Sequence, residues 1–561
     1  METARAQFLN TLELLSLVTT YLAPMDISRL CQTSHRMHET CTPSLYRDLF
    51  ISSCFEKEQT IFASTQCRHA FGRNIGHVRS LTIGPIELHY YYNCLRMFEE
   101  TRPHNLDASA TPASTSSSSS ASSSSSQIPP SSLPQSPTSS LSLPRWLPPA
   151  VHRTHPVEPL PPMTNLQYLV LTDNNHMDCS YRLPKFNDDR MIMAECCWII
   201  SLNPRLEHLS SNYNASLNVL GYRLLAAAVS GLSRLTTLDI SVLCHANLKF
   251  KAGTEILFSC CPSIRKIKIV TADSSFDYSS EFLDYDPDDA IVEDDVDWLV
   301  GTTRKLEPLV NLEELDFWDV MDSASTDDLL TVFEHCPNIQ KLNILTISDL
   351  YDHDVLGEFI GQKCPKIRSL TCGSQFVGLE VDGPLLFKIL DSLPAQTVED
   401  IYFYGAFDGF IETSLTLATL RHSTTLSRIE IGWIYPLAKV SLSAIFEECI
   451  NLEKLDVRCK RCWGRMGLYT TLTNVLERPW NTSKLADLSL SISVNDLPVV
   501  LQAQKQTQRA VAISELRQAH SGRLDELTRR VMSLPGGHGI DVKAGIVTVE
   551  DEDQLVFTKI E

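Results

Sequence analysis

Apolar and polar positions along this chain follow a short sequence motif that recurs many times, which we call the repeat phrase. The phrase begins with Cys-Pro or Asn-Pro. One variable position, an apolar residue and two further residues follow, and then two apolar residues separated by one position, as in 261–269, 336–344 and 364–372. The first apolar residue of the phrase recurs at Leu166, Leu206, Leu235, Ile264, Leu312, Ile339, Ile367, Val398, Leu426, Leu452 and Leu485. Eight of the ten steps between these markers span 26–33 residues, so the chain contains a repeat with two insertions.

Each repeat predicts one strand and one helix. The last two apolar residues of the phrase have the period of two that is typical of a strand with one buried face. Between phrases, as in 327–335, apolar residues recur at helical spacing until the Cys-Pro step, because proline cannot continue a helix. Stacked units of this kind predict an α/β solenoid with parallel strands on a concave face and helices on a convex face. The alternative is an ordinary α/β domain with coincidental internal similarity.

The unit resembles the leucine-rich repeat of the longer, cysteine-containing kind. Seventeen cysteines occur in the chain, and several stand at the predicted helix-to-strand corner, where a cysteine acts as a small buried apolar residue. These corner residues are Cys260, Cys261, Cys336, Cys364 and Cys449. The sequence opens without a signal peptide and has no apolar run long enough to cross a bilayer, so we expect a reducing cytoplasmic or nuclear location.

Residues 8–50 lie outside the repeat and predict three short helices. A module of this size buries too little surface to be secure alone, so we expect a partner or the following domain to complete it. The module resembles an F-box, on Glu13-Leu14-Leu15, Val18, Tyr21-Leu22, Pro24, Asp26, Leu30, Ser34, Arg36 and Tyr46-Arg47-Asp48-Leu49. One departure is that this family has Leu-Pro before its first helix, where this chain has Asn10-Thr11.

An F-box followed by leucine-rich repeats implies a substrate-recognition, non-catalytic subunit of an SCF-type ubiquitin ligase. The helices would bind a Skp-family adaptor and through it a cullin–RING ligase, and the repeats would bind a target protein. The resemblance implies that the adaptor contacts Leu14, Leu15, Val18, Leu22, Pro24, Ile27 and Leu30. Two alternatives are a helical cap on the array and a leucine-rich-repeat scaffold that has no link to ubiquitin.

Composition divides the remainder of the chain. Residues 104–160 form a Ser/Pro-rich insertion that should be disordered, and 273–298 form an acidic loop with no lysine or arginine. The other predicted regions are a connecting segment with a first repeat over 51–103, the main array over 161–495 and a C-terminal cap over 496–561. Within that cap we expect a helix over 500–532 and a hairpin from 545–550 and 554–560.

The predicted concave face carries the candidate protein-binding residues. Aromatic and charged residues flank the buried strand positions, as protein-binding surfaces require. The candidates are Asp316, Trp318, Tyr402, Tyr404, Glu430, Trp433, Asp456 and Arg458. The formal net charge of −20 disfavours nucleic acid and anionic membranes as partners.

Candidate chemistry is sparse. The chain contains no glycine-rich phosphate loop, nucleophile elbow or paired-histidine metal motif. Cys459 and Cys462 have the spacing of half a zinc site without a second pair. We therefore expect no catalytic residues, no metal and no cofactor.

Overall fold

The computed structural model describes most of the repeat region and both ends of the sheet. The described residues are 12–51, 65–101, 160–172, 189–211, 219–244, 249–273, 307–318, 324–345, 352–373, 383–404, 412–432, 442–459, 480–482, 484–485, 487–493, 526, 529–530, 541–549 and 552–560. The predicted Ser/Pro-rich insertion up to residue 159, the predicted acidic loop from residue 274 and nearly all of the predicted helix over 500–532 lie outside them.

The described strands form one fifteen-stranded sheet whose spatial order follows the sequence up to β13. The strands are β1 (Asp48–Ile51), β2 (Ser80–Ile83), β3 (Tyr168–Leu171), β4 (His208–Ser211), β5 (Thr237–Cys244), β6 (Lys266–Asp273), β7 (Glu314–Trp318), β8 (Lys341–Leu345), β9 (Ser369–Gly373), β10 (Asp400–Tyr404), β11 (Arg428–Gly432), β12 (Lys454–Cys459), β13 (Asp487–Ser493), β14 (Asp541–Val549) and β15 (Glu552–Ile560). Neighbours from β1 to β13 pair in parallel. The expected C-terminal hairpin is present, because β14 and β15 pair antiparallel and β15 continues the sheet from β13.

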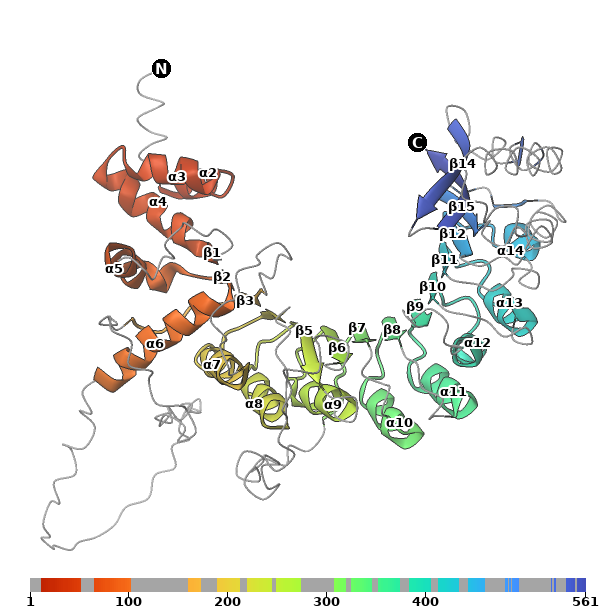
Figure 1. The fold of residues 1–561 in the computed structure, drawn as a ribbon, viewed down its shortest axis with the longest axis horizontal. Coiled ribbons are helices and arrows are strands. Elements are labelled where there is room, and N and C mark those ends of the chain that lie inside the picture. The colour runs from red at the N-terminus through yellow and green to blue at the C-terminus, as the bar shows by residue number, and fades with distance from the viewer. Residues whose placement is uncertain are drawn as a thin grey trace, which may run out of the picture.

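The described helices lie differently against the curved sheet: the first three lie beyond its N-terminal end, and the later ones lie on its outer side (Figure 1). They are α2 (Leu12–Thr19), α3 (Pro24–Cys31), α4 (His35–Arg47), α5 (Thr65–Asn74), the 3-10 turn η1 (Ile75–His77), α6 (Pro85–Thr101), α7 (Asp189–Ser201), α8 (Val219–Ser230), α9 (Lys249–Ser259), α10 (Thr326–His335), α11 (His353–Lys363), α12 (Gly383–Ser392), α13 (Glu412–Leu420) and α14 (Leu442–Glu448). From α7 to α14 they follow the convex side of an arc whose inner wall is the sheet. The predicted α/β class with a parallel sheet is therefore confirmed, in a solenoid-like arrangement.

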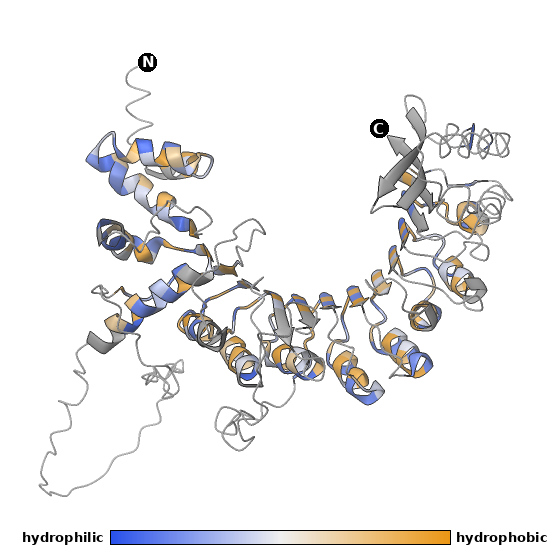
Figure 2. Ribbon diagram, viewed as in Figure 1, coloured by the Kyte–Doolittle hydropathy of each residue, from blue (hydrophilic) through white to orange (hydrophobic). Residues whose placement is uncertain are grey.

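The core runs between the sheet and the convex helices. All eleven repeat markers are completely buried, and from β5 to β12 the two alternating apolar positions that follow a marker stack in register across neighbouring strands. One such row joins Leu315, Leu342 and Leu370 on β7, β8 and β9. Figure 2 shows the resulting alternation of apolar and polar positions along the strands. Stacking of this kind buries each unit against its neighbours, which explains the fixed spacing of the markers.

The corner cysteines join adjacent units. The Cys261 thiol donates to the carbonyl oxygen of Leu235, 3.3 Å away, and the Cys364 thiol donates to that of Cys336 over 3.4 Å. Burial raises the pKa of Cys364 and of Cys449 to about 12, so both remain thiols. The sequence-based expectation of small, buried corner residues is confirmed for all five of these cysteines.

His422 occupies the comparable corner between α13 and β11 and is completely buried. Its Nδ1 accepts from the backbone amides of Thr397 and Val398, at 3.3 and 3.4 Å, while Nε2 donates to the carbonyl oxygen of Leu390 at 3.0 Å. An accepting Nδ1 requires the neutral ring. Burial accordingly lowers the pKa of His422.

Mild acid should therefore destabilise this part of the array. The pKa of His422 in the folded state lies below its value of about 6.5 in the unfolded chain. Neutral His422 therefore contributes fully to the free energy of unfolding at pH values above about 6.5, and this contribution is lost as the pH falls through the folded pKa. We expect the melting temperature to fall between about pH 7 and pH 5, and His422→Gln to reduce that dependence. The matched control is His35→Gln, because His35 is exposed on α4. Equal pH dependence in both variants would contradict the assignment.

A second buried polar contact joins α6 to α7. His89 Nδ1 lies 2.7 Å from Glu195 Oε1, and both side chains are at least nine-tenths buried. The Asn93 amide donates to the carbonyl oxygen of His89 over 2.9 Å and lies 3.0 Å from His89 Nε2, so Nε2 accepts and Nδ1 carries the proton. Burial raises the pKa of Glu195.

The chain returns to α6 after the interval 102–159. The backbone amide of Leu160 donates to the carbonyl oxygen of Cys94 at 3.1 Å, and the Leu160 side chain is buried. A Cβ added at Gly72 on α5 would lie 2.9 Å from Leu160 Cδ2. Leu160 therefore closes a junction between α5 and α6.

Candidate functional site

The N-terminal helices α2, α3 and α4 form a module with a very small core. Its buried apolar residues are Leu15, Ile27, Met37 and Cys41. Leu22, Leu30, Cys31 and Leu45 pack against them while remaining partly exposed. A core of this size contributes little free energy of folding by itself, so neighbouring contacts should matter for the module.

One face of α2 and the start of α3 expose apolar side chains. Tyr21 is 83% exposed, Met25 67% and Leu17 56%, and Val18 is also exposed. Leu17 lies on α2 and Tyr21 in the turn after its end, and both are exposed, whereas Leu15 and Leu22 pack in the internal core. A short helix with apolar residues on both its inner and outer sides is typical of a binding surface.

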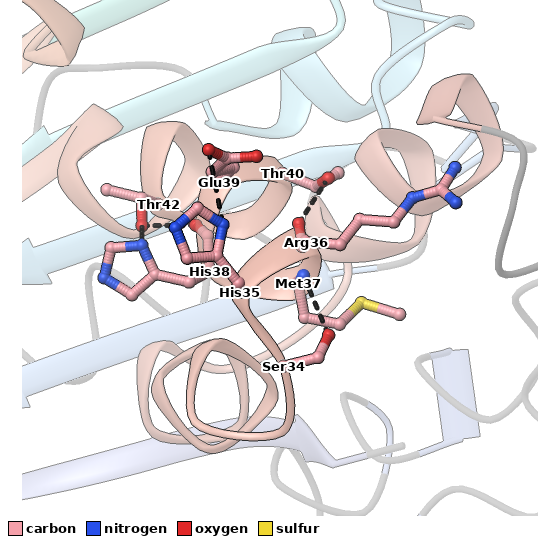
Figure 3. A network of polar contacts seen from close by, with 8 residues as sticks. All are labelled: Ser34, His35, Arg36, Met37, His38, Glu39, Thr40 and Thr42. Atoms are coloured by element: carbon pink, nitrogen blue, oxygen red, sulfur yellow. Dashed lines mark hydrogen bonds and ion pairs between the residues drawn. The ribbon is translucent and has the colours of Figure 1, made fainter.

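A network of polar contacts runs along the first part of α4, between residues 34 and 42 (Figure 3). Ser34 caps the helix by accepting from the backbone amide of Met37 at 3.2 Å, and His35 lies 3.4 Å from Glu39. The Thr40 hydroxyl donates to the carbonyl oxygen of Arg36 at 2.9 Å. The large apolar side chains that the described part of 12–47 exposes therefore belong to α2, to the α2–α3 turn and to α3.

The seven residues expected to contact an adaptor divide between the interior and the surface. Leu15 and Ile27 are buried in the module, and Leu22 and Leu30 are half-buried against its core. Val18 and Pro24 are exposed, and the side chain of Leu14 lies outside the described part of the structure. The sequence-based prediction left out Leu17 and Met25, and it placed Tyr21 only in the motif. Helical spacing could not have related Tyr21 to Leu17, because α2 ends at Thr19 and Tyr21 lies in the following turn.

The concave wall is the second candidate surface. On the concave side of the sheet, strand register aligns one residue from the middle of each strand. We call this line of residues the middle row. From β5 to β12 the middle row comprises Asp239, Lys268, Asp316, Asn343, Thr371, Tyr402, Glu430 and Asp456. Two residues earlier on each strand lies the first row, comprising Thr237, Lys266, Glu314, Lys341, Ser369, Asp400, Arg428 and Lys454.

Cations of the two rows contact groups within the wall. Lys266 Nζ lies 2.9 Å from Glu314 Oε1, and Lys454 Nζ lies 2.8 Å from Glu430 Oε1. Lys268 Nζ lies 3.7 Å from Asp239 Oδ1. These cross-strand contacts hold the long side chains along the wall.

Asp316 and Asn343 lie side by side near the centre of the middle row. Asn343 Nδ2 donates to Asp316 Oδ2 at 3.1 Å. Asp316 Oδ1 and Asn343 Oδ1 are both buried and have no hydrogen-bond partner among the described residues. Burial raises the pKa of Asp316 to about 6, although its bond with Asn343 and the charge of Lys268 act in the opposite direction.

The structure places the predicted concave residues unevenly. Tyr402 and Glu430 are half-buried on the wall, whereas Asp456 is only 5% exposed, so its carboxylate is enclosed and does not project freely. Trp318, Tyr404 and Arg458 share a third row, two positions after the middle row, on β7, β10 and β12. The side chains of these three residues, and all of Trp433, lie outside the described part of the structure.

An aromatic group at the first strands was not expected from sequence. Phe50 on β1 is 71% exposed in the middle row, and Tyr168 on β3 is exposed in the first row. The Tyr168 ring lies 5.9 Å from that of His208 on β4. The regular phrase at Leu166 was sufficient to place Tyr168 on β3, whereas Phe50 lies outside the repeat, so its strand could not be placed from the sequence.

Metal-binding and membrane-spanning features are absent from the part of the chain that the structure describes. Among the described residues, no group of three or more His, Cys, Asp or Glu side chains is arranged to hold a metal ion. None of the described helices has both the length and the apolar character that a membrane crossing requires. Neither a protein-family model nor a curated protein matches this chain.

Proposed function

We propose that this chain is a substrate-recognition, non-catalytic subunit of an SCF-type ubiquitin ligase. In this proposal α2 and α3 bind a Skp-family adaptor, and the concave wall, as part of a leucine-rich-repeat array, binds the protein to be ubiquitinated. The observation that carries the proposal is the exposed apolar face of Leu17, Val18, Tyr21 and Met25 beside a four-residue core. Burying that face against a partner would supply stability that the module lacks alone.

The order of the two surfaces also supports the proposal. The module precedes the array in the chain, and β1, which follows α4 directly, begins the sheet. The adaptor and the client would therefore contact separate parts of one continuous body, the N-terminal module and the inner wall of the arc (Figure 1). A non-catalytic receptor needs this division, because it brings a client near a ligase without performing chemistry itself.

Binding of a purified Skp-family adaptor by the full chain tests the proposal. We expect Leu17→Glu/Tyr21→Glu to weaken binding about thirtyfold or more, because an interfacial tyrosine commonly contributes about 2 kcal/mol and each 1.4 kcal/mol corresponds to tenfold in affinity. Both residues are exposed, so circular dichroism should show an unchanged fold.

The matched control is Gln32→Glu/His38→Glu, which adds two carboxylates to exposed positions of the same module. This control should bind the adaptor as the natural chain does. Equal weakening in both variants would indicate a charge effect without a defined surface. Absence of adaptor binding by the natural chain would favour a protein-interaction scaffold unrelated to ubiquitin.

A further inference from the structure

Asp316 on β7 and Asn343 on β8 lie opposite each other near the centre of the middle row. One hydrogen bond joins them, from Asn343 Nδ2 to Asp316 Oδ2, with the two atoms 3.1 Å apart. The other oxygen of each side chain is buried and has no hydrogen-bond partner among the described residues. A buried acceptor that lacks a donor costs free energy, so an arrangement that supplies a donor would be favoured.

The protonation state of Asp316 decides whether these two oxygens can bond to each other. An ionised carboxylate only accepts hydrogen bonds, and so does the oxygen of an amide, so two such atoms have no hydrogen to share. A neutral carboxylic acid, in contrast, carries one O–H donor. A single proton on Asp316 would therefore supply the hydrogen that both buried oxygens lack.

We propose that Asp316 binds a proton in the folded chain at mildly acidic pH, and that its Oδ1–H then donates to Asn343 Oδ1. Together with the bond already present, this contact closes a ring of two hydrogen bonds between an acid and an amide. Two side-chain bonds then join β7 to β8 in place of one. The inference does not depend on the proposed function, because it concerns contacts within the array.

The charged groups that face Asp316 from neighbouring strands act in both directions. Lys268, directly opposite on β6, and Lys341 on β8 favour the ionised carboxylate, whereas Asp239 on β5 disfavours it. Both lysines are exposed, so solvent weakens their attraction, and Lys268 also lies 3.7 Å from Asp239 Oδ1. Burial is the largest influence. Against the lysines and the bond from Asn343, it raises the pKa of Asp316 to about 6.

This pKa determines the direction of the pH effect. The pKa of Asp316 is about 3.9 in the unfolded chain and about 6 in the folded chain. Proton binding therefore contributes fully to the free energy of unfolding at pH values below about 3.9, and this contribution is lost as the pH rises through about 6. The strands β7 and β8 should thus open less readily in mild acid than at neutral pH, whereas the opposite is expected around His422.

Protonation also changes the charge of the wall. It removes one negative charge beside Lys268 and Lys341, so this part of the wall becomes more positive by one unit. Neighbouring groups do not offset the change, because Glu314 lies 2.9 Å from Lys266 and the next residue along the middle row, Thr371, is uncharged. A charged partner that contacts this part of the wall would therefore bind with an affinity that depends on pH.

Asp316→Asn tests the inference, because an amide at this position can form the closed pair at every pH. Its Nδ2 would donate to Asn343 Oδ1, and its Oδ1 would accept from Asn343 Nδ2. Hydrogen exchange of the backbone amides of β7 and β8, followed by mass spectrometry on the full chain, measures local opening. Comparison of the two proteins at the same pH cancels the intrinsic pH dependence of exchange.

We expect opening of β7 and β8 in the natural chain to increase about tenfold, relative to Asp316→Asn, between about pH 5 and pH 7. A shift in the pKa of Asp316 from about 3.9 to about 6 requires a change of this size. The matched control is Glu314→Gln, which removes a carboxylate two residues earlier on the same strand. Opening of this variant relative to the natural chain should change little over the same range.

An opening ratio for Asp316→Asn that is equally independent of pH would overturn the inference. Asp316 would then be ionised throughout the range, and a buried water that donates to both oxygens would satisfy them instead.

Infrared difference spectroscopy separates protonation from the closed pair. The spectrum of the natural chain minus that of Asp316→Asn should show the carbonyl band of a neutral carboxylic acid at about pH 5 and lose it at about pH 8. With Asn343→Leu in both proteins, this band should move to higher wavenumber, because the acid O–H has lost its acceptor. A band at an unchanged wavenumber would overturn the pair, since the acid would then donate elsewhere. Absence of the band in mild acid would overturn protonation itself.

Discussion

Gly361→Ala is expected to destabilise the array by about 1–3 kcal/mol, although alanine is the better helix former by about 1 kcal/mol. Gly361 lies on α11 against the end of α12. A Cβ at this position would lie 2.4 Å from Ser392 Cβ, 2.8 Å from the Ser392 carbonyl carbon and 3.0 Å from the Leu393 amide nitrogen. Because two of these atoms belong to the backbone, the helices must move apart. Chemical denaturation of the full chain measures the loss.

The control for this substitution is Gly76→Ala. No atom lies within 4 Å of a Cβ added at Gly76, so its effect should stay within about 0.5 kcal/mol. Gly357, one helical turn before Gly361, offers a second test, because its added Cβ would lie 2.4 Å from Lys388 Cβ and 3.1 Å from the Ile389 amide nitrogen. Similar stability of the Gly361→Ala and Gly76→Ala variants would show that α11 and α12 separate at little cost.

His89→Leu should cost more, about 3–5 kcal/mol at neutral pH. The substitution keeps the volume of the side chain but leaves the Glu195 carboxylate buried without its partner. Burial raises the pKa of Glu195 in the folded state above its value in the unfolded chain. Glu195 therefore contributes fully to the free energy of unfolding at pH values below its unfolded pKa, and this contribution is lost as the pH rises through its folded pKa. The defect should therefore be smaller in mild acid. Thermal unfolding across that pH range checks both the size and the sign.

The double variant His89→Leu/Glu195→Met tests the cause of that defect. Replacing both partners of a buried polar pair by apolar residues of similar volume is commonly neutral, so the double variant should recover most of the stability. Its melting temperature should also depend less on pH. A double variant as unstable as His89→Leu alone would mean that lost packing against α7, and not the buried carboxylate, causes the defect.

The repeat architecture could be predicted because every unit repeats the same local pattern. Each marker, from Leu166 to Leu485, is followed by a strand signal, several markers follow a proline that ends the preceding helix, and all of the markers are buried in the core. Residues such as Gly357 and Gly361 were not predictable in the same way. Their role depends on how closely α12 approaches α11, and neither helix encodes that distance by itself.

The candidate surfaces were predictable in position but not in detail. Alternation along the strands placed Asp316, Tyr402 and Asp456 on the same wall, and the register confirms this. Alternation does not report how deeply a side chain is enclosed, so the 5% exposure of Asp456 was not foreseen. In the module, a motif resemblance selected Leu15 and Ile27, whereas exposure depends on the packing of three helices around them.

Because Leu160 is anchored on α6, the geometry of the array does not depend on the length of the interval 102–159 that precedes it. The backbone amide of Leu160 donates to the carbonyl oxygen of Cys94, which lies seven residues, or about 10 Å of helix, before the end of α6 at Thr101. About four extended residues suffice to cross that gap. Insertions and deletions between these two anchors can therefore change the length of the interval without changing the curvature of the wall. We expect homologous sequences to differ strongly in length here and hardly at all at the helix-to-strand corners.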